Sequence, residues 1–320
     1  MSSTVYTPLV LFVYILAFVT GVPSNLLAFH TFLVKVRQKP SPIVLFLLNL
    51  TLSDLLLLLI LPFKMVEAAS GMTWPMPRFL CPIVVWVYYC CFYVSSLFLT
   101  AVSIERYLGV AYPMKYKVSR ITVYAIWFCG FIWGFSALHG SIPFIVITVL
   151  PRSLLMFCVP FMITIFCYFN FVRLLSSMSK IGRKKKSRAI CLALATLFNF
   201  AICFAPYNIS HIVGFIQNKS PRWRDYALLL STLNASIDPI VFYYSSTDVQ
   251  RTFLKCFQGI RRKQCIQDAN EAQVELSQIS EVDSPSPMSG WAHGPRASVK
   301  ETGQPRAYPT LPISDQGMKL

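Results

Sequence analysis

Seven long apolar segments constrain the fold of this chain more than any other feature of its sequence. A membrane-spanning helix needs about 20 apolar residues, because each residue rises about 1.5 Å and the hydrocarbon core is about 30 Å thick. Seven segments meet this requirement, and they lie near residues 8–34, 42–67, 79–108, 121–148, 152–176, 185–216 and 224–245. The sequence therefore predicts an all-α fold, a seven-transmembrane helix bundle.

The composition agrees with a chain that crosses a membrane several times. Hydrophobic residues make up 55% of the 320 residues and charged residues only 13%, with a mean hydropathy of +0.56; a soluble domain carries about 25% charged residues. The net charge of +16 comes from short basic clusters between apolar runs. Such clusters are typical of loops at the inner leaflet, so no nucleic acid partner is expected.

The positions of the bases predict the orientation of the chain. Bases collect after segments one, three, five and seven, at Lys35, Arg37, Lys39, Lys115, Lys117, Arg120, Lys180, Arg183, Lys184, Lys185, Lys186, Arg188, Arg251, Lys255, Arg261, Arg262 and Lys263. The opposite side has few, notably Arg78, Lys219, Arg222 and Arg224. By the positive-inside rule, we expect a multi-pass plasma-membrane protein with an extracellular N-terminus and a cytoplasmic C-terminus. No cleavable signal peptide is expected, because the first apolar run is too long for one.

Four regions follow from this pattern. Residues 1–7 are a short extracellular N-terminus and 8–245 the seven-transmembrane domain, while 246–265 form an amphipathic helix on the membrane surface and 266–320 a disordered cytoplasmic tail. Cys256 and Cys265 are either palmitoylation sites or plain thiols. The tail serines either receive phosphates that recruit arrestin or are incidental. Asn218 is the one glycosylation sequon in an outer loop, although Pro221 and the nearby membrane disfavour its use.

A charged triplet, Glu105-Arg106-Tyr107, closes the third apolar segment. Charge at a membrane boundary is costly unless it has a function. Pro160, Pro206 and Pro239 each free a backbone carbonyl inside a span and so predict kinks about which the helices pivot. Tyr168, two turns below Pro160, is expected to reach Arg106 when the cytoplasmic side opens.

Four polar residues lie at the depth of the middle of the membrane: Asn25, Asp54, Ser95 and Asp238. Two carboxylates with Asn and Ser oxygens predict an allosteric sodium site, whose metal ligands would be Asp54, Ser95 and Asp238. The alternative is a hydrated hydrogen-bond network without a cation. No other cofactor is expected.

These residues resemble the rhodopsin-like (class A) receptors over residues 8–260, which implies that Glu105, Arg106, Tyr107 and Tyr168 form a G-protein switch. Two positions depart from the pattern. Phe204 precedes Ala205-Pro206 where a tryptophan is usual, and Phe242 occupies a usual tyrosine position. In addition, Lys186 stands where an acid would hold Arg106, so we expect appreciable basal activity.

Polar residues also gather at the predicted outer helix ends, at Tyr89, Tyr93, His139, Tyr207, His211 and Arg224. Tyr207 and His211 are four residues apart and share a helix face. Arginine offers a planar fork suited to a carboxylate, and His and Tyr donate to its second oxygen. The set predicts a small anionic ligand; the alternative for Arg224 alone is an outward position among lipid headgroups.

Several strings sharpen the resemblance, among them Leu61-Pro62-Phe63-Lys64, Cys203-Phe204-Ala205-Pro206-Tyr207-Asn208-Ile209-Ser210-His211 and Leu233-Asn234-Ala235-Ser236-Ile237-Asp238-Pro239. They are similar to the free fatty acid receptors, specifically the short-chain carboxylate branch. The resemblance implies activation by acetate, propionate and butyrate, signalling through Gi/o and in some members Gq-type G proteins, and ligand-binding roles for Arg224, His139 and Arg152.

One departure is large. In the family a long loop joins helices four and five and carries a cysteine that pairs with the one at Cys81, whereas here residues 141–152 run almost directly from one segment to the next. Arg152 lies eight residues before Pro160, about one turn closer than the family spacing. The alternatives are a loop-deleted, non-signalling isoform or a receptor for another small anion. A transporter would show internal symmetry, which we do not find. Ser/His/Asp arrangements, metal-ligand spacings and phosphate-binding loops are also lacking, so the chain is not expected to be an enzyme.

Overall fold

The computed structural model describes residues 3–113, 121–141, 150–178, 182–217, 219, 221, 223–245, 249–256, 258, 259 and 261. Side chains are described from Thr7 onward, except those of residues 121, 122, 150–156 and 245. All of these residues belong to one compact unit, Met1–Arg262. The predicted disordered tail, Cys265 and Asn218 lie outside the described residues.

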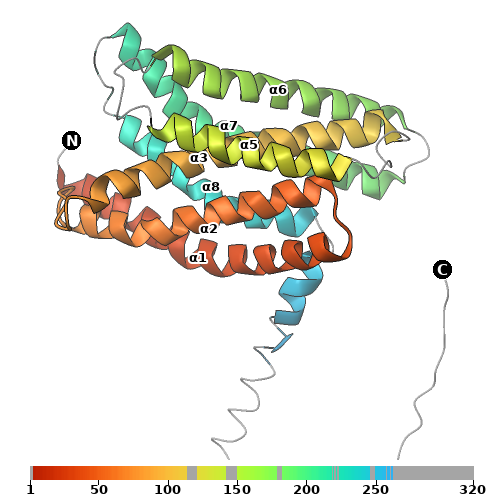
Figure 1. Ribbon diagram of the computed structural model, residues 1–320, viewed down its shortest axis with the longest axis horizontal. Coiled ribbons are helices and arrows are strands. Elements are labelled where there is room, and N and C mark those ends of the chain that lie inside the picture. Colours follow the sequence, from red (N-terminus) through yellow and green to blue (C-terminus); the bar gives the residue numbers. More distant parts are fainter. Residues whose placement is uncertain are drawn as a thin grey trace, which may run out of the picture. The chain divides into compact units, whose positions relative to one another are not determined.

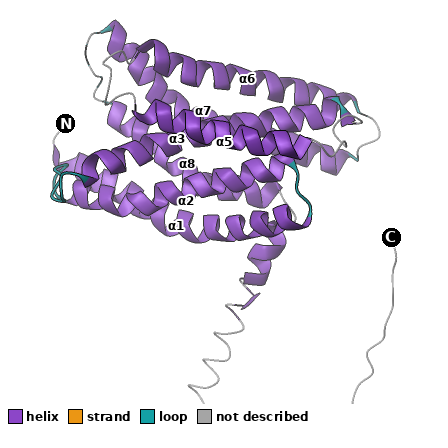
Figure 2. Ribbon diagram, viewed as in Figure 1, coloured by secondary structure: helices purple, strands orange, loops and turns teal. Residues whose placement is uncertain are grey.

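The described residues form a bundle of long helices without strands (Figures 1 and 2). The helices are α1 (Ser3–Gln38), α2 (Pro42–Ala69), α3 (Leu80–Ala111), α5 (Ile121–Ser141), α6 (Leu150–Ser177), α7 (Arg183–Ile216) and α8 (Arg224–Ser245). Six of them are long and apolar enough to cross a membrane, and α8 is more polar because it contains Arg224, Asp225 and Asp238. The prediction of an all-α seven-helix bundle is confirmed.

Local sequence explains where α2 begins and ends. Ser41 has an extended backbone at φ −146° and is followed by Pro42, whose ring favours the first helical turn. After α2 the chain reverses through Gly71 and Met72, which have φ values of 70° and 63°. Glycine adopts this left-handed conformation at little cost. The turn brings α3 back against α2.

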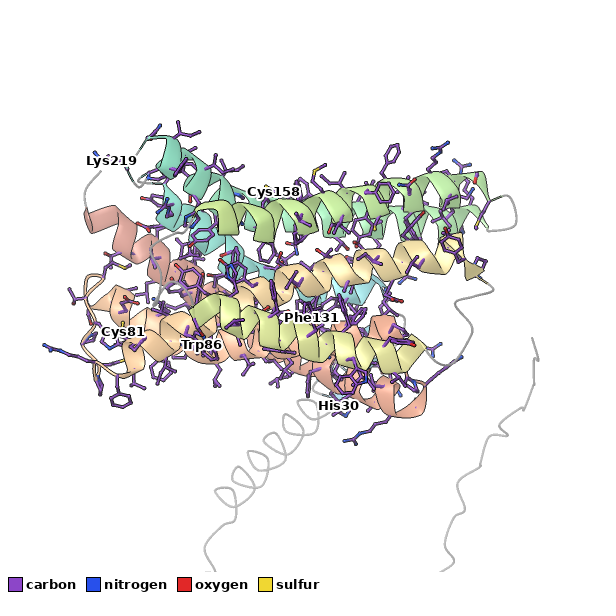
Figure 3. All side chains as sticks on the ribbon, turned by 45° about the horizontal axis from the view of Figure 1, so that its top comes forward. His30, Cys81, Trp86, Phe131, Cys158 and Lys219 are labelled. Atoms are coloured by element: carbon purple, nitrogen blue, oxygen red, sulfur yellow. The ribbon has the colours of Figure 1, made fainter. Side chains whose placement is uncertain are left out.

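Helix α3 lies at the centre of the bundle, where it packs on α2, α5, α6 and α7. Its Phe98 is completely buried, whereas α5 exposes Trp127 and Phe131 with 77% and 61% of their surface accessible. Figure 3 shows Phe131 on the outer side of α5. Large apolar side chains on the outside of a bundle are stable in contact with lipid. At Gly21, α1 comes so near α2 that an added Cβ would lie 2.9 Å from Leu58 Cδ2.

Aromatic rings fill the interface between α6 and α7. Phe157 and Phe161 of α6 both stack on Phe200 of α7, with interplanar angles of 7° and 9° and ring centroids 6.0 and 5.6 Å apart. Phe204 continues the cluster, 5.2 Å from Phe200 and 5.0 Å from Phe92 of α3. These rings lie beside Pro160 and Pro206, where the helices lack a backbone hydrogen bond.

Residues 249–256 are helical. Val249 is completely buried, and the ring of Phe253 lies 5.6 Å from that of Tyr243 at the end of α8. Arg251 and Lys255 are exposed, so this short helix has one apolar face against the bundle and one basic face. Cys256 is partly exposed and has a free thiol. Its palmitoylation stays a prediction.

Candidate functional site

A layer of aromatic side chains connects α3 to α7 near one end of the bundle. The Tyr207 hydroxyl donates a hydrogen bond to the Tyr89 hydroxyl at 3.2 Å. The His211 ring meets the edge of Tyr207, with centroids 4.8 Å apart. Tyr207 is 5% exposed, and His211, one turn further along α7, is partly exposed. The His211 imidazole therefore packs against the hydrogen-bonded pair of Tyr207 and Tyr89.

The same layer extends to α5. Tyr93 of α3 lies edge-on to His139, with ring centroids 4.3 Å apart, and His139 is 6% exposed. Phe92 connects the Tyr93–His139 pair to the Tyr207–His211 pair, because its ring centroid is 5.4 Å from those of both Tyr93 and Tyr207. The structure thus brings Tyr89, Tyr93, His139, Tyr207 and His211 into one continuous layer.

Arg224, the first residue of α8, extends across to α7. Its Nε donates to Ser210 Oγ at 3.2 Å and its Nη2 to the Ser210 carbonyl oxygen at 3.0 Å. A Cβ added to Gly214 would lie 2.5 Å from Nη2, so the guanidinium occupies the space that glycine leaves open. Guanidinium has five N–H donors, and these two bonds leave donors for a ligand. The Arg152 side chain lies outside the described part of the chain.

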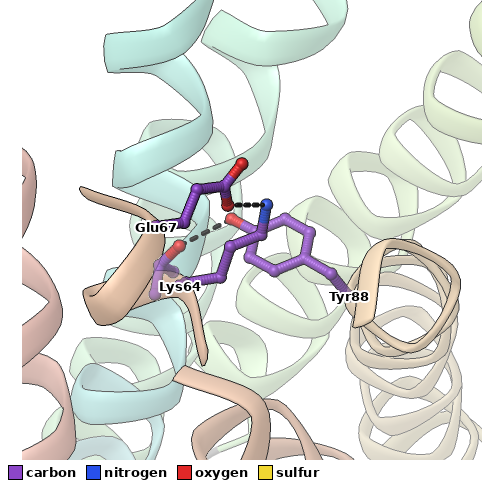
Figure 4. Close-up of polar contacts among 4 residues, drawn as sticks. Lys64, Glu67 and Tyr88 are labelled. Carbon is purple, nitrogen blue, oxygen red and sulfur yellow. Dashed lines mark hydrogen bonds and ion pairs between the residues drawn. The ribbon is translucent and has the colours of Figure 1, made fainter. Parts of the chain in front are cut away.

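A half-buried ion pair lies on α2 near this end of the bundle. Lys64 Nζ is 2.8 Å from Glu67 Oε2, and the side chains are 18% and 20% exposed (Figure 4). Nearby, the Tyr88 hydroxyl shares a hydrogen bond of 2.6 Å with Thr232 and reaches the Leu228 carbonyl at 3.1 Å. Sequence reasoning missed this pair; two opposite charges three residues apart inside an apolar segment were the available signal.

At the other end of α3, Arg106 contacts both α6 and α7. Its Nη1 donates to Tyr168 at 3.5 Å and to Thr196 Oγ1 at 3.3 Å. The Tyr107 ring lies 6.2 Å from that of Phe166, and Glu105 lines a groove of about 480 Å³ between α3 and α5. Arg106 is therefore held by neutral hydroxyls. The sequence predicted the Tyr168 contact for an opened cytoplasmic side; the contact is present in this arrangement, and the Thr196 contact was not foreseen.

Lys186, which stands where an acid was expected, bonds elsewhere. Its Nζ donates to the Ser176 carbonyl oxygen at 2.8 Å, so it connects α7 to α6. A further base, Arg188, connects α7 to α8: Nε and Nη2 donate to the Tyr244 carbonyl oxygen at 3.0 and 2.9 Å. Both contacts use backbone oxygens rather than carboxylates.

The polar residues in the middle of the bundle form two groups. Ser95 donates to Asp54 Oδ1 at 3.5 Å and shares a 3.2 Å bond with Ser53. Asp238 accepts from the amides of Asn199 and Asn234 at 2.9 and 2.8 Å. Asn25 donates to the Ala235 carbonyl at 2.6 Å and thereby joins α1 to α8.

The surroundings of Asp54 fit a small cation. Asp54 is 1% exposed, and its Oδ2 has no hydrogen-bond partner among the described residues. A cavity of about 10 Å³, the space of a single water, is lined by Asp54, Ser95, Ser231 and Asn234 among others. Both Asp238 oxygens accept amide bonds. Asp54 and Ser95 are thus the better placed of the three expected ligands.

Cys81 lies in the first turn of α3. Its side chain is partly exposed, and its thiol forms no disulfide with any cysteine that the structure describes. Figure 3 places Cys81 at the same end of the bundle as Lys219 and opposite to His30. Residues 142–149, the connection between α5 and α6, lie outside the described residues.

The comparison with known proteins identifies the class. Residues 24–153 and 146–242 match the family described as 7 transmembrane receptor (rhodopsin family). The chain belongs to this family of multi-pass membrane receptors, and within it to the free fatty acid receptors. It is 40% identical to free fatty acid receptor 3 of Mus musculus over 82% of this chain and 91% of the relative.

Two further relatives agree. Free fatty acid receptor 2 of Rattus norvegicus is 43% identical over 80% of this chain and 87% of its own length. G-protein coupled receptor 42 of Homo sapiens is 42% identical over 75% of this chain and 78% of its own length. The resemblance expected from the sequence strings is confirmed, and the relatives are signalling receptors rather than enzymes.

The comparison also locates a shortening of this chain. The match to the mouse relative extends over 293 aligned positions, whereas 82% of 320 residues is about 262. About 30 aligned positions therefore have no residue here. The two family matches overlap at residues 146–153, which include the start of α6 and follow the segment where the sequence lacks the expected loop.

Proposed function

We propose that this receptor is activated by short-chain carboxylates such as acetate, propionate and butyrate and signals through Gi/o and Gq-type G proteins. The observation that carries the proposal is the position of Arg224, whose guanidinium is bonded to Ser210, next to His211 in α7. A carboxylate bound there meets a fixed positive charge and an imidazole. These groups provide the charge-assisted bonds that recognise a small anion.

The aromatic layer supports a short ligand. Tyr89 and Tyr207 are hydrogen-bonded to each other, and the Tyr207 ring packs against His211. We therefore expect an acyl chain whose carboxylate is at Arg224 to contact these tyrosine rings within a few carbons. Acetate has four heavy atoms, and a limit of about −1.5 kcal/mol per atom gives at most about −6 kcal/mol, a Kd of tens of micromolar at best. Potency is expected between high micromolar and millimolar concentrations.

Signal transfer requires the release of Arg106. In the present arrangement Thr196 of α7 and Tyr168 of α6 accept from its guanidinium. Outward movement of α7 removes Thr196 and exposes Arg106 to the G protein. We further propose that Asp54 and Ser95 bind an allosteric sodium ion, that arrestin binds the phosphorylated tail, and that the receptor lies in the plasma membrane with its N-terminus outside.

Dose-response curves for unbranched C2 to C8 acids, read as G-protein activation, test the proposal. Arg224→Ala should abolish the response, because one hydrogen bond to a charged group contributes about 1.5–3 kcal/mol, whereas an added methylene contributes about 0.8 kcal/mol. Lys219→Ala, which removes an exposed base from the same end, should respond normally. Equal responses of wild type and Arg224→Ala, or a preference for amines, would exclude a carboxylate receptor.

A further inference from the structure

A groove of about 970 Å³ runs along the outer side of the bundle between α6 and α7. Its walls are apolar and include Phe161, Leu194 and Phe198. Leu194 and Phe198 are 52% and 68% exposed, so this wall faces away from the protein core. An exposed apolar surface of this kind suits a hydrocarbon chain.

One end of the groove is basic. Arg183 and Lys186 of the first turn of α7 line it, together with Ser187. The Lys186 Nζ is held there by its bond to the Ser176 carbonyl, and an ammonium has three donors. The groove lining contains no acidic side chain, and neither α6 nor α7 contains Asp or Glu. The positive charges at this end therefore have no carboxylate partner on the two helices that form the groove.

The charge arrangement of this turn favours an anion. Arg183, Lys184, Lys185 and Lys186 are consecutive cations at the start of α7. The amino end of a helix carries partial positive charge, so it repels cations and attracts anions. A phosphate between Arg183 and Lys186 offsets the repulsion among these cations and the repulsion between them and the amino end of the helix.

The length of the groove also suits a phospholipid. Arg183 and Phe198 are 15 residues apart, about 22 Å along α7. One leaflet of hydrocarbon is about 15 Å deep. Leu194 is 11 residues from Arg183, about 16 Å along the helix, so a headgroup at Arg183 places its acyl chain against Leu194.

We propose that this groove binds an anionic phospholipid of the inner leaflet, with its phosphate at Arg183 and Lys186 and one acyl chain along the α6–α7 wall. The assignment to the inner leaflet rests on the orientation given under the proposed function. The lipid contacts the two helices whose separation exposes Arg106, so its occupancy regulates the receptor. This site is separate from Arg224 and the aromatic layer.

Binding of phosphatidylserine and phosphatidylcholine to the purified full-length receptor, counted by native mass spectrometry, tests the proposal. Arg183→Gln/Lys186→Gln should weaken phosphatidylserine binding at least about tenfold, since each lost charged contact corresponds to about that factor. The matched control is Lys184→Gln/Lys185→Gln, which removes the same charge from exposed positions that do not line the groove. It should change binding less than about twofold.

Ala195→Phe tests the apolar wall without changing the charge. Ala195 is exposed and lines the groove, so the added ring should occupy the acyl-chain position and weaken phosphatidylserine binding. Three results would overturn the proposal: equal losses in both charge variants, equal wild-type binding of phosphatidylcholine and phosphatidylserine, or unchanged binding to Ala195→Phe. The assay contains neither fatty acid nor G protein, so its outcome is independent of the carboxylate response.

Discussion

Arg188 of α7 donates two hydrogen bonds, at 3.0 and 2.9 Å, to the carbonyl oxygen of Tyr244 near the end of α8. The contact connects α7 to the last turn of α8. The last four carbonyl oxygens of a helix have no partner within that helix, and the Arg188 guanidinium donates to one of them. Arg188 thereby provides a constraint on α7 that an acidic residue would otherwise supply through Arg106.

Arg188→Gln should raise basal nucleotide exchange about two- to fivefold, because loss of the paired bonds shifts the closed–open equilibrium by about 0.4–1 kcal/mol. The measurement is GTPγS binding without added ligand. Lys185→Gln removes an exposed charge of the same turn and should leave the basal rate unchanged. A basal rate equal to wild type in Arg188→Gln would show that the contact does not restrain the receptor.

Arg106→Ala should abolish nucleotide exchange while surface expression stays near normal. The guanidinium contacts hydroxyls rather than a carboxylate, so its removal leaves no unpaired buried charge and the bundle keeps its stability. Exchange assays and surface immunolabelling measure the two effects. Unchanged exchange would contradict the receptor mechanism, and a loss of surface protein would show that Arg106 is structural.

Gly214→Ala should reduce carboxylate potency about tenfold or more. Its new Cβ would lie 2.5 Å from Arg224 Nη2, so the guanidinium must shift from its position beside Ser210. Concentration-response curves for propionate measure the loss. Gly134→Ala is a matched control, because nothing lies within 4 Å of a Cβ added at Gly134. If both variants respond like wild type, the position of Arg224 on α7 does not matter for binding.

Cys81 should react with an impermeant maleimide on intact cells, since its thiol is free and partly exposed. Cys81→Ser should remove the signal. We also expect weaker surface delivery than for a version that carries a full second outer loop with its cysteine, because loss of a native bridge costs about 2–5 kcal/mol in small domains. Labelling that appears only after reduction would reveal a partner for Cys81.

The helices were predictable because the bilayer dictates their length and composition. The segment expected near 42–67 is helix Pro42–Ala69, and that near 224–245 is Arg224–Ser245. The segment near 121–148 is described as helix only to Ser141. The short connection between α5 and α6 was also evident from the sequence, because it depends only on the number of residues between the two apolar segments.

The partners of the polar residues were less predictable, because they depend on how the helices rotate against one another. Thr196 and Arg106 are 90 residues apart in the chain, and nothing in either segment indicates that they meet. Likewise nothing in the sequence indicated that Asn199 and Asn234 donate to the two oxygens of Asp238. The grouping of Tyr207 and His211 was foreseeable because their spacing is local.

The stacked rings of Phe157, Phe161 and Phe200 have a mechanical consequence. Interlocked branched side chains must separate before two helices can slide, because each fills a hollow of its neighbour. Nearly parallel ring faces, within 7° and 9° of each other, have no such interlocking. A shift of α7 parallel to the ring faces would therefore keep much of the ring contact, whereas a tilt of α7 away from α6 would break it.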